Sequence, residues 1–209
     1  LTVPQMNIWN TEMFYSGTNI NNICGDVEFK EKINFEVIEK AINYTIKNND
    51  TLNYRIEIDN GNPVCRCDIF SDLKLKIYNL KTEKELKELK EKISNTKFDL
   101  KEDRLVNFVG YTLKDKQNGI IGVFHHLCTD AWGVSLFIDR AIKVYEELLD
   151  GNFDEKEYPK YSEYVKENEE YLNSEKFNND KEFWKGLFKE EPELTYISNN
   201  KSLFNPKSE

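Results

Sequence analysis

The chain has 209 residues, of which 39% are hydrophobic and 13% aromatic, so it can build a hydrophobic core and is not disordered over most of its length. The net charge is -9 and the lysines alternate with glutamates, which argues against a nucleic-acid-binding protein. No apolar run reaches the roughly 18 residues that a membrane-spanning helix needs, and the first residues lack the features of a signal peptide.

The first part of the chain predicts a helix, a strand and a second helix. A short helix is expected at Gln5–Asn10, after Pro4. Alternating polarity predicts a strand at Ile23–Phe29. Apolar residues at helical spacing then predict a helix that begins after an N-cap at Asn34 and continues to Lys47.

The middle of the chain predicts mainly strands. A hairpin is expected from strands at 52–58 and 64–69 around a turn at 60–62. The further expected elements are a strand at 73–80, a charged helix at 83–95, and paired strands at 106–113 and 120–126 around a polar turn at 115–119.

The last part of the chain predicts helices. Asp130 begins a helix at Ala131–Leu149, and residues 161–188 form a helical, aromatic and charged segment. About 190–209 is a polar tail without a clear element. Strands and helices alternate, which predicts an α+β fold with a mixed sheet packed against helices, and residues 1–209 are expected to form one unit.

The cysteines do not predict a disulfide framework. Cys65 and Cys67 lie on one face of an expected strand, but a metal clip there needs two further ligands and the chain has two histidines in all. Reduced cysteines of a cytosolic protein are the simplest interpretation.

The two histidines are adjacent, at the end of an apolar strand, and an aspartate follows them. The strand period places His125 and His126 on opposite faces, so one of them can point into a given cleft. On spacing alone, purely structural roles stay open: a histidine could be a hydrogen-bonded core residue, and Asp130 could be an N-cap. A zinc site of His126, Cys128 and Asp130 lacks an evident fourth ligand.

The segment from His125 to Gly133, HHLCTDAWG, resembles the H-H-x-x-x-D-G core motif of the condensation domains of nonribosomal peptide synthetases. Other family landmarks follow in the same order. They are LTVPQ at 1–5 with Trp9, the segment 48–56 where the family has R-H-E-x-L-R-T-x-F, YSEYV at 161–165, and FWK at 183–185.

The resemblance implies a two-lobed fold like that of chloramphenicol acetyltransferase, with the active site between the lobes. This chain would be the N-terminal lobe, because the later motifs of the C-terminal lobe are absent from it, and about 190–209 would be a polar tail or the start of the connection to the missing lobe. The chain begins at Leu1 without an initiator Met, so we expect it to be part of a longer protein. Alone it is expected to be inactive.

The resemblance also implies the chemistry. The amine of an acceptor aminoacyl thioester attacks a donor acyl thioester, and both are carried on phosphopantetheine arms of peptidyl carrier proteins. His126 is then the catalytic residue that accepts a proton from the amine or orients it. His125 and Asp130 support the motif, and the N–H groups of Ala131 and Trp132 are candidate oxyanion donors. No cofactor, metal, nucleic-acid or membrane partner is expected.

The sequence departs from the family pattern in ways that bear on activity. Ala131 replaces the motif glycine, and the two arginines of the second motif fall on Asn48 and Asn53. Because Arg55 lies two residues beyond Asn53 in an expected strand, we predict that it pairs with Asp130 instead.

Three alternatives stay open at this point. An epimerisation domain shares the histidine motif, a stand-alone acyltransferase shares the fold, and a degenerate condensation-like domain would serve only as a docking platform.

Overall fold

A computed structural model describes residues 1–114 and 117–190, which fall into two units, Leu1–Tyr164 and the residues from Val165 onward. Each unit is described by itself. The elements are α1 (Val3–Phe14), β1 (Asn22–Phe29), α2 (Phe35–Lys47), the 3₁₀ helix η1 (Asp50–Asn53), β2 (Tyr54–Asp59), β3 (Asn62–Cys67), β4 (Lys76–Leu80), α3 (Glu83–Ser94), β5 (Val106–Leu113), β6 (Gln117–His125), α4 (Ala131–Leu149), α5 (Tyr161–Leu172) and α6 (Glu175–Leu187).

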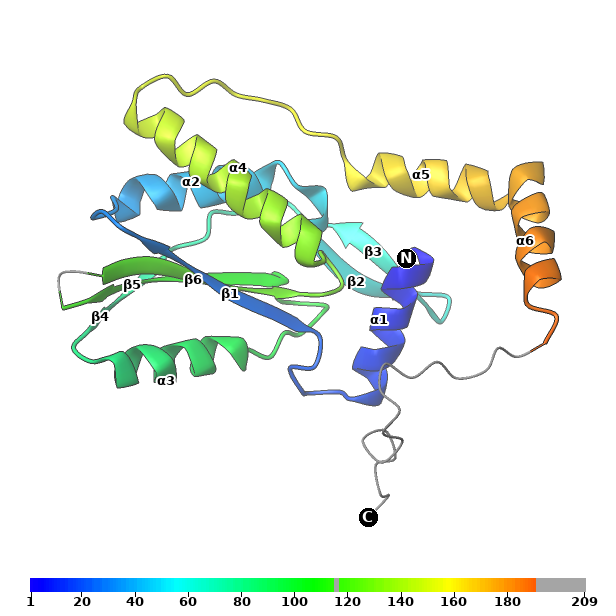
Figure 1. Cartoon of the computed structure of the whole chain (residues 1–209), viewed down its shortest axis with the longest axis horizontal. Helices are drawn as coiled ribbons and strands as arrows, with labels where there is room; N and C mark the ends of the chain where they lie inside the picture. Colours follow the sequence, from blue (N-terminus) through cyan, green and yellow to red (C-terminus); the bar gives the residue numbers. More distant parts are fainter. Residues whose placement is uncertain (115–116, 191–209) are drawn as a thin grey trace, which may run out of the picture. The chain divides into compact units, whose positions relative to one another are not determined.

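The first unit is built on a four-stranded mixed sheet in the order β1-β6-β5-β4. The β4–β5 pair is parallel, and the other two pairs are antiparallel. Helices α2 and α4 cover one face of this sheet and α3 covers the other (Figure 1). The predicted α+β class is therefore confirmed.

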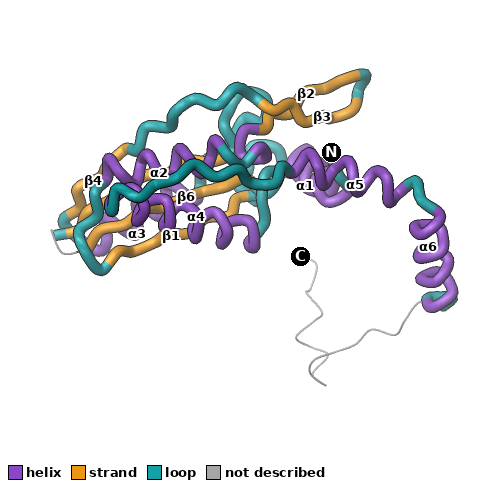
Figure 2. Tube along the Cα trace, turned by 90° about the horizontal axis from the view of Figure 1, so that it is seen from above, coloured by secondary structure: helices purple, strands orange, loops and turns teal. Residues whose placement is uncertain are grey.

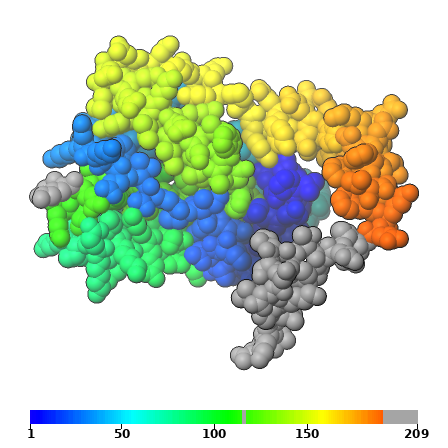
Figure 3. All heavy atoms as spheres, in the orientation of Figure 1, coloured from blue at the N-terminus to red at the C-terminus, as the bar shows by residue number. Residues whose placement is uncertain are grey.

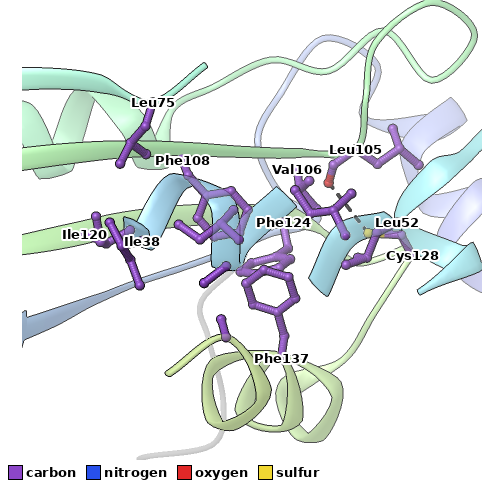
Figure 4. Close-up of a cluster of buried hydrophobic side chains, with 14 of the residues drawn as sticks. Ile38, Leu52, Leu75, Leu105, Val106, Phe108, Ile120, Phe124, Cys128 and Phe137 are labelled. Carbon is purple, nitrogen blue, oxygen red and sulfur yellow. Dashed lines mark hydrogen bonds between the residues drawn. The ribbon is translucent and has the colours of Figure 1, made fainter. Parts of the chain in front are cut away.

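The core on the α2 and α4 side is aromatic. The Phe108 ring stacks on Phe137 at 5.2 Å between centroids and meets Phe124 edge-on at 5.3 Å. Figure 4 shows these rings between the sheet and α4. Aromatic pairs of this kind contribute about 0.5–1.5 kcal/mol each beyond the apolar area they bury.

The core on the α3 side is formed by the apolar stripe of that helix. Leu86 and Leu89 pack with Ile121 and Val123 of β6, all of them buried. Because Phe124 packs on the opposite face, the alternation predicted for β6 is confirmed.

The predicted hairpin is present as β2–β3, which stands apart from the four-stranded sheet (Figure 2). Its two-residue turn is Asn60–Gly61, with φ of 48° and 82°, as a type I′ turn requires. Its start was predicted wrongly, because residues 50–53 form the 3₁₀ helix η1 and the strand begins at Tyr54. This change of backbone breaks the strand parity between Asn53 and Arg55.

Other boundaries also differ from the prediction. α1 runs from Val3 to Phe14, because a capping box between Thr2 and Gln5 starts it one residue before Pro4. β4 begins at Lys76 instead of residue 73. The segment expected to be helical over 161–188 contains two helices, since Ser174 caps a new one. Two residues of the turn predicted at 115–119, and the tail from 191 onward, lie outside the described residues.

In the described ranges, no helix is both long enough and apolar enough to cross a bilayer.

Candidate active site

The two adjacent histidines have opposite environments. Strand β6 ends at His125, whose side chain is buried with 2% of its surface exposed, whereas His126 begins the following turn and is exposed. The opposite orientation that the strand period predicts for the two side chains agrees with this placement.

The buried imidazole of His125 has a hydrogen bond at each nitrogen. The Leu127 N–H donates to Nδ1 at 3.2 Å, and Nε2 lies 3.3 Å from Oε2 of Glu12 on α1. Because Nδ1 accepts a backbone N–H, the ring proton of the neutral imidazole is on Nε2 and is donated to Glu12. Burial lowers the pKa of His125; the hydrogen bond and charge of Glu12 raise it, and neighbouring His126 lowers it.

The backbone after β6 is fixed from both sides. The His126 N–H donates to the carbonyl of Asn21 at 2.7 Å, and Gln5 Nε2 of α1 donates to the carbonyl of Leu127 at 3.2 Å.

The thiol of Cys128 is buried and donates to the carbonyl of His125 at 3.0 Å. Burial raises the pKa of that thiol to about 12, so it is not a nucleophile at neutral pH.

His126 faces a cleft of about 710 Å³. The cleft is bounded by α1, the η1 loop, the turn after β6, the first turns of α4 and the start of α5. On the face drawn in Figure 3, the atoms of α1 (dark blue) lie next to those of the first turns of α4 (yellow-green). Phe124 of β6 also lines the cleft.

Asp130 is the N-cap of α4. Its Oδ1 accepts the N–H of Gly133 at 2.8 Å, and the side chain is exposed. Gly133 lines the cleft, whereas neither Ala131 nor Trp132 is among the lining residues that the structure describes. The oxyanion role of Ala131 and Trp132 stays a prediction, and the cleft lining does not support it.

The predicted pair of Arg55 and Asp130 is not formed. Arg55 is buried, with 8% exposed, and donates to the carbonyls of Tyr54 at 3.0 Å and Glu102 at 3.3 Å. Its charged partner is Asp68 at 3.7 Å. The physical reason is η1, which ends the strand parity on which the prediction depended.

The asparagines at the two family arginine positions cap α2. Asn53 Nδ2 donates to the carbonyls of Ile46 and Asn49 at 2.8 and 3.1 Å, and Asn48 Nδ2 donates to the carbonyl of Tyr44 at 2.9 Å. They add side-chain donors to carbonyl groups in the last turn of α2, and Asn53 also connects that turn to Asn49, the N-cap of η1.

Asp50 and Arg140 are site residues that the sequence did not single out. Asp50 accepts the N–H groups of Tyr161 at 2.9 Å and Ser162 at 3.1 Å, which fixes the start of α5 at the cleft. Arg140 lines the cleft from α4 and lies over the ring of Tyr158 at 4.1 Å.

Glu12 is a further residue that the sequence left unassigned. A helix extended beyond Asn10 places Glu12 at helical spacing from Gln5 and Ile8, on the face that packs inward. This spacing could have indicated an inward-facing Glu12, but the predicted helix ended at Asn10 and did not include it.

Within the part of the chain that the structure describes, no three His, Cys, Asp or Glu side chains gather closely enough to hold a metal ion.

Comparison with known proteins places this geometry in a family. The family model for the condensation domain matches residues 1–207. The chain belongs to the condensation domain family. Its relatives include surfactin synthase subunit 1 of Bacillus subtilis, with 28% identity over 97% of this chain, and the dimodular nonribosomal peptide synthase of the same organism, with 22% identity over 95%. The chain spans 6% and 8% of these two relatives.

The fold matches solved condensation domains. The starter condensation domain of rhizomide synthetase RzmA superposes with a TM-score of 0.82 at 18% identity, covering 92% of this chain and 48% of that one. The first condensation domain of the CDA synthetase gives a TM-score of 0.79 at 20% identity, covering 95% and 52%. This condensation-domain chain thus corresponds to about half of such a domain.

Proposed function

We propose that this chain supplies the histidine-bearing N-terminal lobe of a condensation domain that forms amide bonds. In this reaction the acceptor amine attacks the carbonyl carbon of the donor thioester, a C–N bond forms, and the C–S bond breaks to release the donor thiol. Donor and acceptor are carried on phosphopantetheine arms of two peptidyl carrier proteins in the cytoplasm. The C-terminal lobe and neighbouring synthetase domains complete the assembly.

The observation that carries the proposal is the exposure of His126 to a cleft of about 710 Å³ while His125 beside it is buried. Clefts of roughly 300–1,000 Å³ accommodate small-molecule ligands. A neutral imidazole at this position accepts the proton of the attacking amine or orients its lone pair. Asp130 acts as a cap that fixes the start of α4, not as a proton donor.

The proposal is tested with the chain joined to a C-terminal lobe and supplied with loaded donor and acceptor carrier proteins. Mass spectrometry of the acceptor carrier detects the amide product. His126→Ala is expected to lower product formation by about 100-fold or more while the protein stays folded. Glu157→Gln, at an exposed position, is the matched control. Unchanged turnover in a folded His126→Ala protein would refute the catalytic assignment.

We further propose that the isolated chain folds but is inactive, because the cleft has walls from one lobe alone. Large apolar side chains near it are exposed, including Val3 at 62%, Trp132 at 74% and Leu136 at 39%. Surfaces of this kind favour association with another protein surface. We expect concentration-dependent self-association of the isolated chain in sedimentation velocity, and no amide product.

A non-catalytic docking platform is the second candidate, favoured by one observation. Neither Asn53 nor Arg55 contacts Asp130 in the described residues, so the motif aspartate lacks the arginine partner of the family pattern. A platform would bind loaded carrier proteins without forming product, and His126→Ala would leave that binding unchanged. Epimerisation of a carrier-bound residue, or acyl transfer to a free amine, would instead assign one of the related activities.

A further inference from the structure

Glu12 is a buried acid that has no role in the proposed reaction. Its side chain projects inward from α1, and the residue is 7% exposed. One oxygen, Oε2, accepts the Asn21 side-chain amide at 2.8 Å and lies 3.3 Å from Nε2 of His125. Within the described residues, it has no lysine or arginine partner.

A buried carboxylate is expensive unless its partners require the charge. Asn21 and neutral His125 are both neutral donors, and a glutamine amide oxygen could accept from both without the desolvation cost of an ion. A carboxylate differs from glutamine in that it can only accept hydrogen bonds. The carboxylate can therefore form a hydrogen bond with Nε2 of His125 only when Nε2 carries the proton, whereas the side-chain amide of a glutamine could also donate to an unprotonated Nε2.

The location of the ring proton on Nε2 determines the hydrogen bond that Nδ1 can form. With the proton on Nε2, Nδ1 is a lone-pair acceptor and takes the Leu127 N–H at 3.2 Å. On the other side of His126, the His126 N–H is held by the Asn21 carbonyl at 2.7 Å, and the same Asn21 binds Glu12 through its side chain. Both peptide groups that flank His126 are thus tied to one buried cluster.

We propose that Glu12 is a positioning residue for His126: it holds His125 in the Nε2–H form, so that His125 and Asn21 together fix the backbone on both sides of His126. This inference rests on the proposed role of His126, and it deepens that role.

Acid is the natural perturbation of this arrangement. Protonation of Nδ1 turns the acceptor into a donor that faces the Leu127 N–H, so the hydrogen bond is lost. The titratable groups acting on the ring are Glu12 from α1 and His126 from the turn, while Phe98 packs edge-on at 6.0 Å and is apolar. The charge of Glu12 stabilises the protonated ring and so sets the pH at which the backbone is released.

The chain is well suited to a direct test because it contains two histidines. In the ¹⁵N-histidine-labelled 209-residue protein, long-range ¹H–¹⁵N spectra report which ring nitrogen carries the proton, and His126→Ala assigns the two rings. We expect His125 to show a protonated Nε2 and an unprotonated Nδ1 at pH 7.5. On acidification, the Leu127 amide should lose hydrogen-exchange protection with the midpoint of the His125 titration. A proton on Nδ1 at pH 7.5, or a Leu127 amide that does not follow His125, overturns the proposal.

Glu12→Gln isolates the charge. In this variant we expect the shared midpoint of His125 and the Leu127 amide to move to lower pH by about one unit or more, because an opposite charge at hydrogen-bonding distance typically raises a histidine pKa by that amount. The exposed Glu157→Gln should leave the midpoint unchanged. An unchanged midpoint in folded Glu12→Gln overturns the role of the charge. If the variant does not fold, the protonation of the two His125 ring nitrogens in the unaltered protein still tests the proposal.

These measurements do not depend on turnover. An inactive assembled domain with the expected His125 tautomer would reject the proposed function alone, and an active one with the wrong tautomer would reject this inference alone.

Discussion

The cap that Asp130 provides for α4 allows a quantitative prediction. Asp130 is exposed, and its carboxylate has one hydrogen bond among the described residues, to the Gly133 N–H at 2.8 Å. Loss of an N-cap side chain costs about 0.5–2 kcal/mol, and asparagine caps about as well as aspartate. We therefore expect Asp130→Ala to lower the free energy of unfolding by about 1 kcal/mol, and Asp130→Asn to leave it nearly unchanged.

Arg55 is expected to behave independently. Arg55→Met removes the donors to the carbonyls of Tyr54 and Glu102, and the first of these two hydrogen bonds is buried. Such a loss costs about 1–3 kcal/mol. Because Arg55 and Asp130 share no partner, the double variant should lose the sum of the single losses to within about 0.5 kcal/mol.

Urea denaturation followed by tryptophan fluorescence measures the free energy of unfolding of the unaltered protein and of all four variants. Thr82→Ala is the matched control, because Thr82 caps α3 in the same way, accepting the N–H of Glu85 at 3.2 Å. A loss of about 3–5 kcal/mol for Asp130→Ala, with strong coupling to Arg55→Met, is what a buried ion pair would give. That result would refute the cap interpretation and restore the pairing.

Three further predictions concern the hydrogen bonds of the buried residues His125 and Asn118. His125→Ala should lower the free energy of unfolding by about 1–3 kcal/mol, because it leaves Glu12 and the Leu127 N–H without partners, while His126→Ala should cost less than about 0.5 kcal/mol in the same urea assay. Since burial lowers the pKa of His125, its neutral form is favoured on folding. The contribution of His125 to the free energy of unfolding is complete above its unfolded pKa of about 6.5 and is lost as the pH falls through its lower pKa in the folded state. The difference in free energy of unfolding between the unaltered protein and His125→Asn should therefore shrink between pH 7.5 and 5. A constant difference would contradict this. Asn118→Ala should cost about 2–4 kcal/mol by thermal or urea melts, because this buried amide accepts the Ile33 N–H at 2.7 Å and donates to the carbonyls of Phe29 and Glu31; a loss under about 1 kcal/mol would show that water replaces these bonds.

Much of the fold was predictable because the local signals agree with the packing. α2 and α4 have the predicted ends, since Asn34 and Asp130 cap them as their residue types favour. β5 and β6 pair with each other as predicted, and the hairpin turn follows from Asn60–Gly61. Where a residue's role depends on one regular element, its periodicity is sufficient evidence.

The failed pairing of Arg55 with Asp130 has one cause, which is that periodicity does not reveal a short change of backbone conformation. Residues 50–53 contain no Gly or Pro, yet they form η1, and Arg55 consequently contacts Tyr54, Glu102 and Asp68 instead of Asp130. The pairing prediction required the parity to hold across that segment.

The two histidines show which part of a site a sequence can supply. Parity separates His125 from His126, and the resemblance assigns the exposed one to chemistry, but the reason for keeping a second histidine lies in partners distant along the chain. Glu12 is 113 residues from His125, and no local pattern joins them. An alanine at 125 would fill the strand end equally well as far as periodicity goes, yet it could neither accept the Leu127 N–H nor donate to a buried carboxylate. In the proposed mechanism the two histidines have different roles: the hydrogen bonds of His125 fix the backbone, and the ring of His126, which lines the cleft, acts on the substrate.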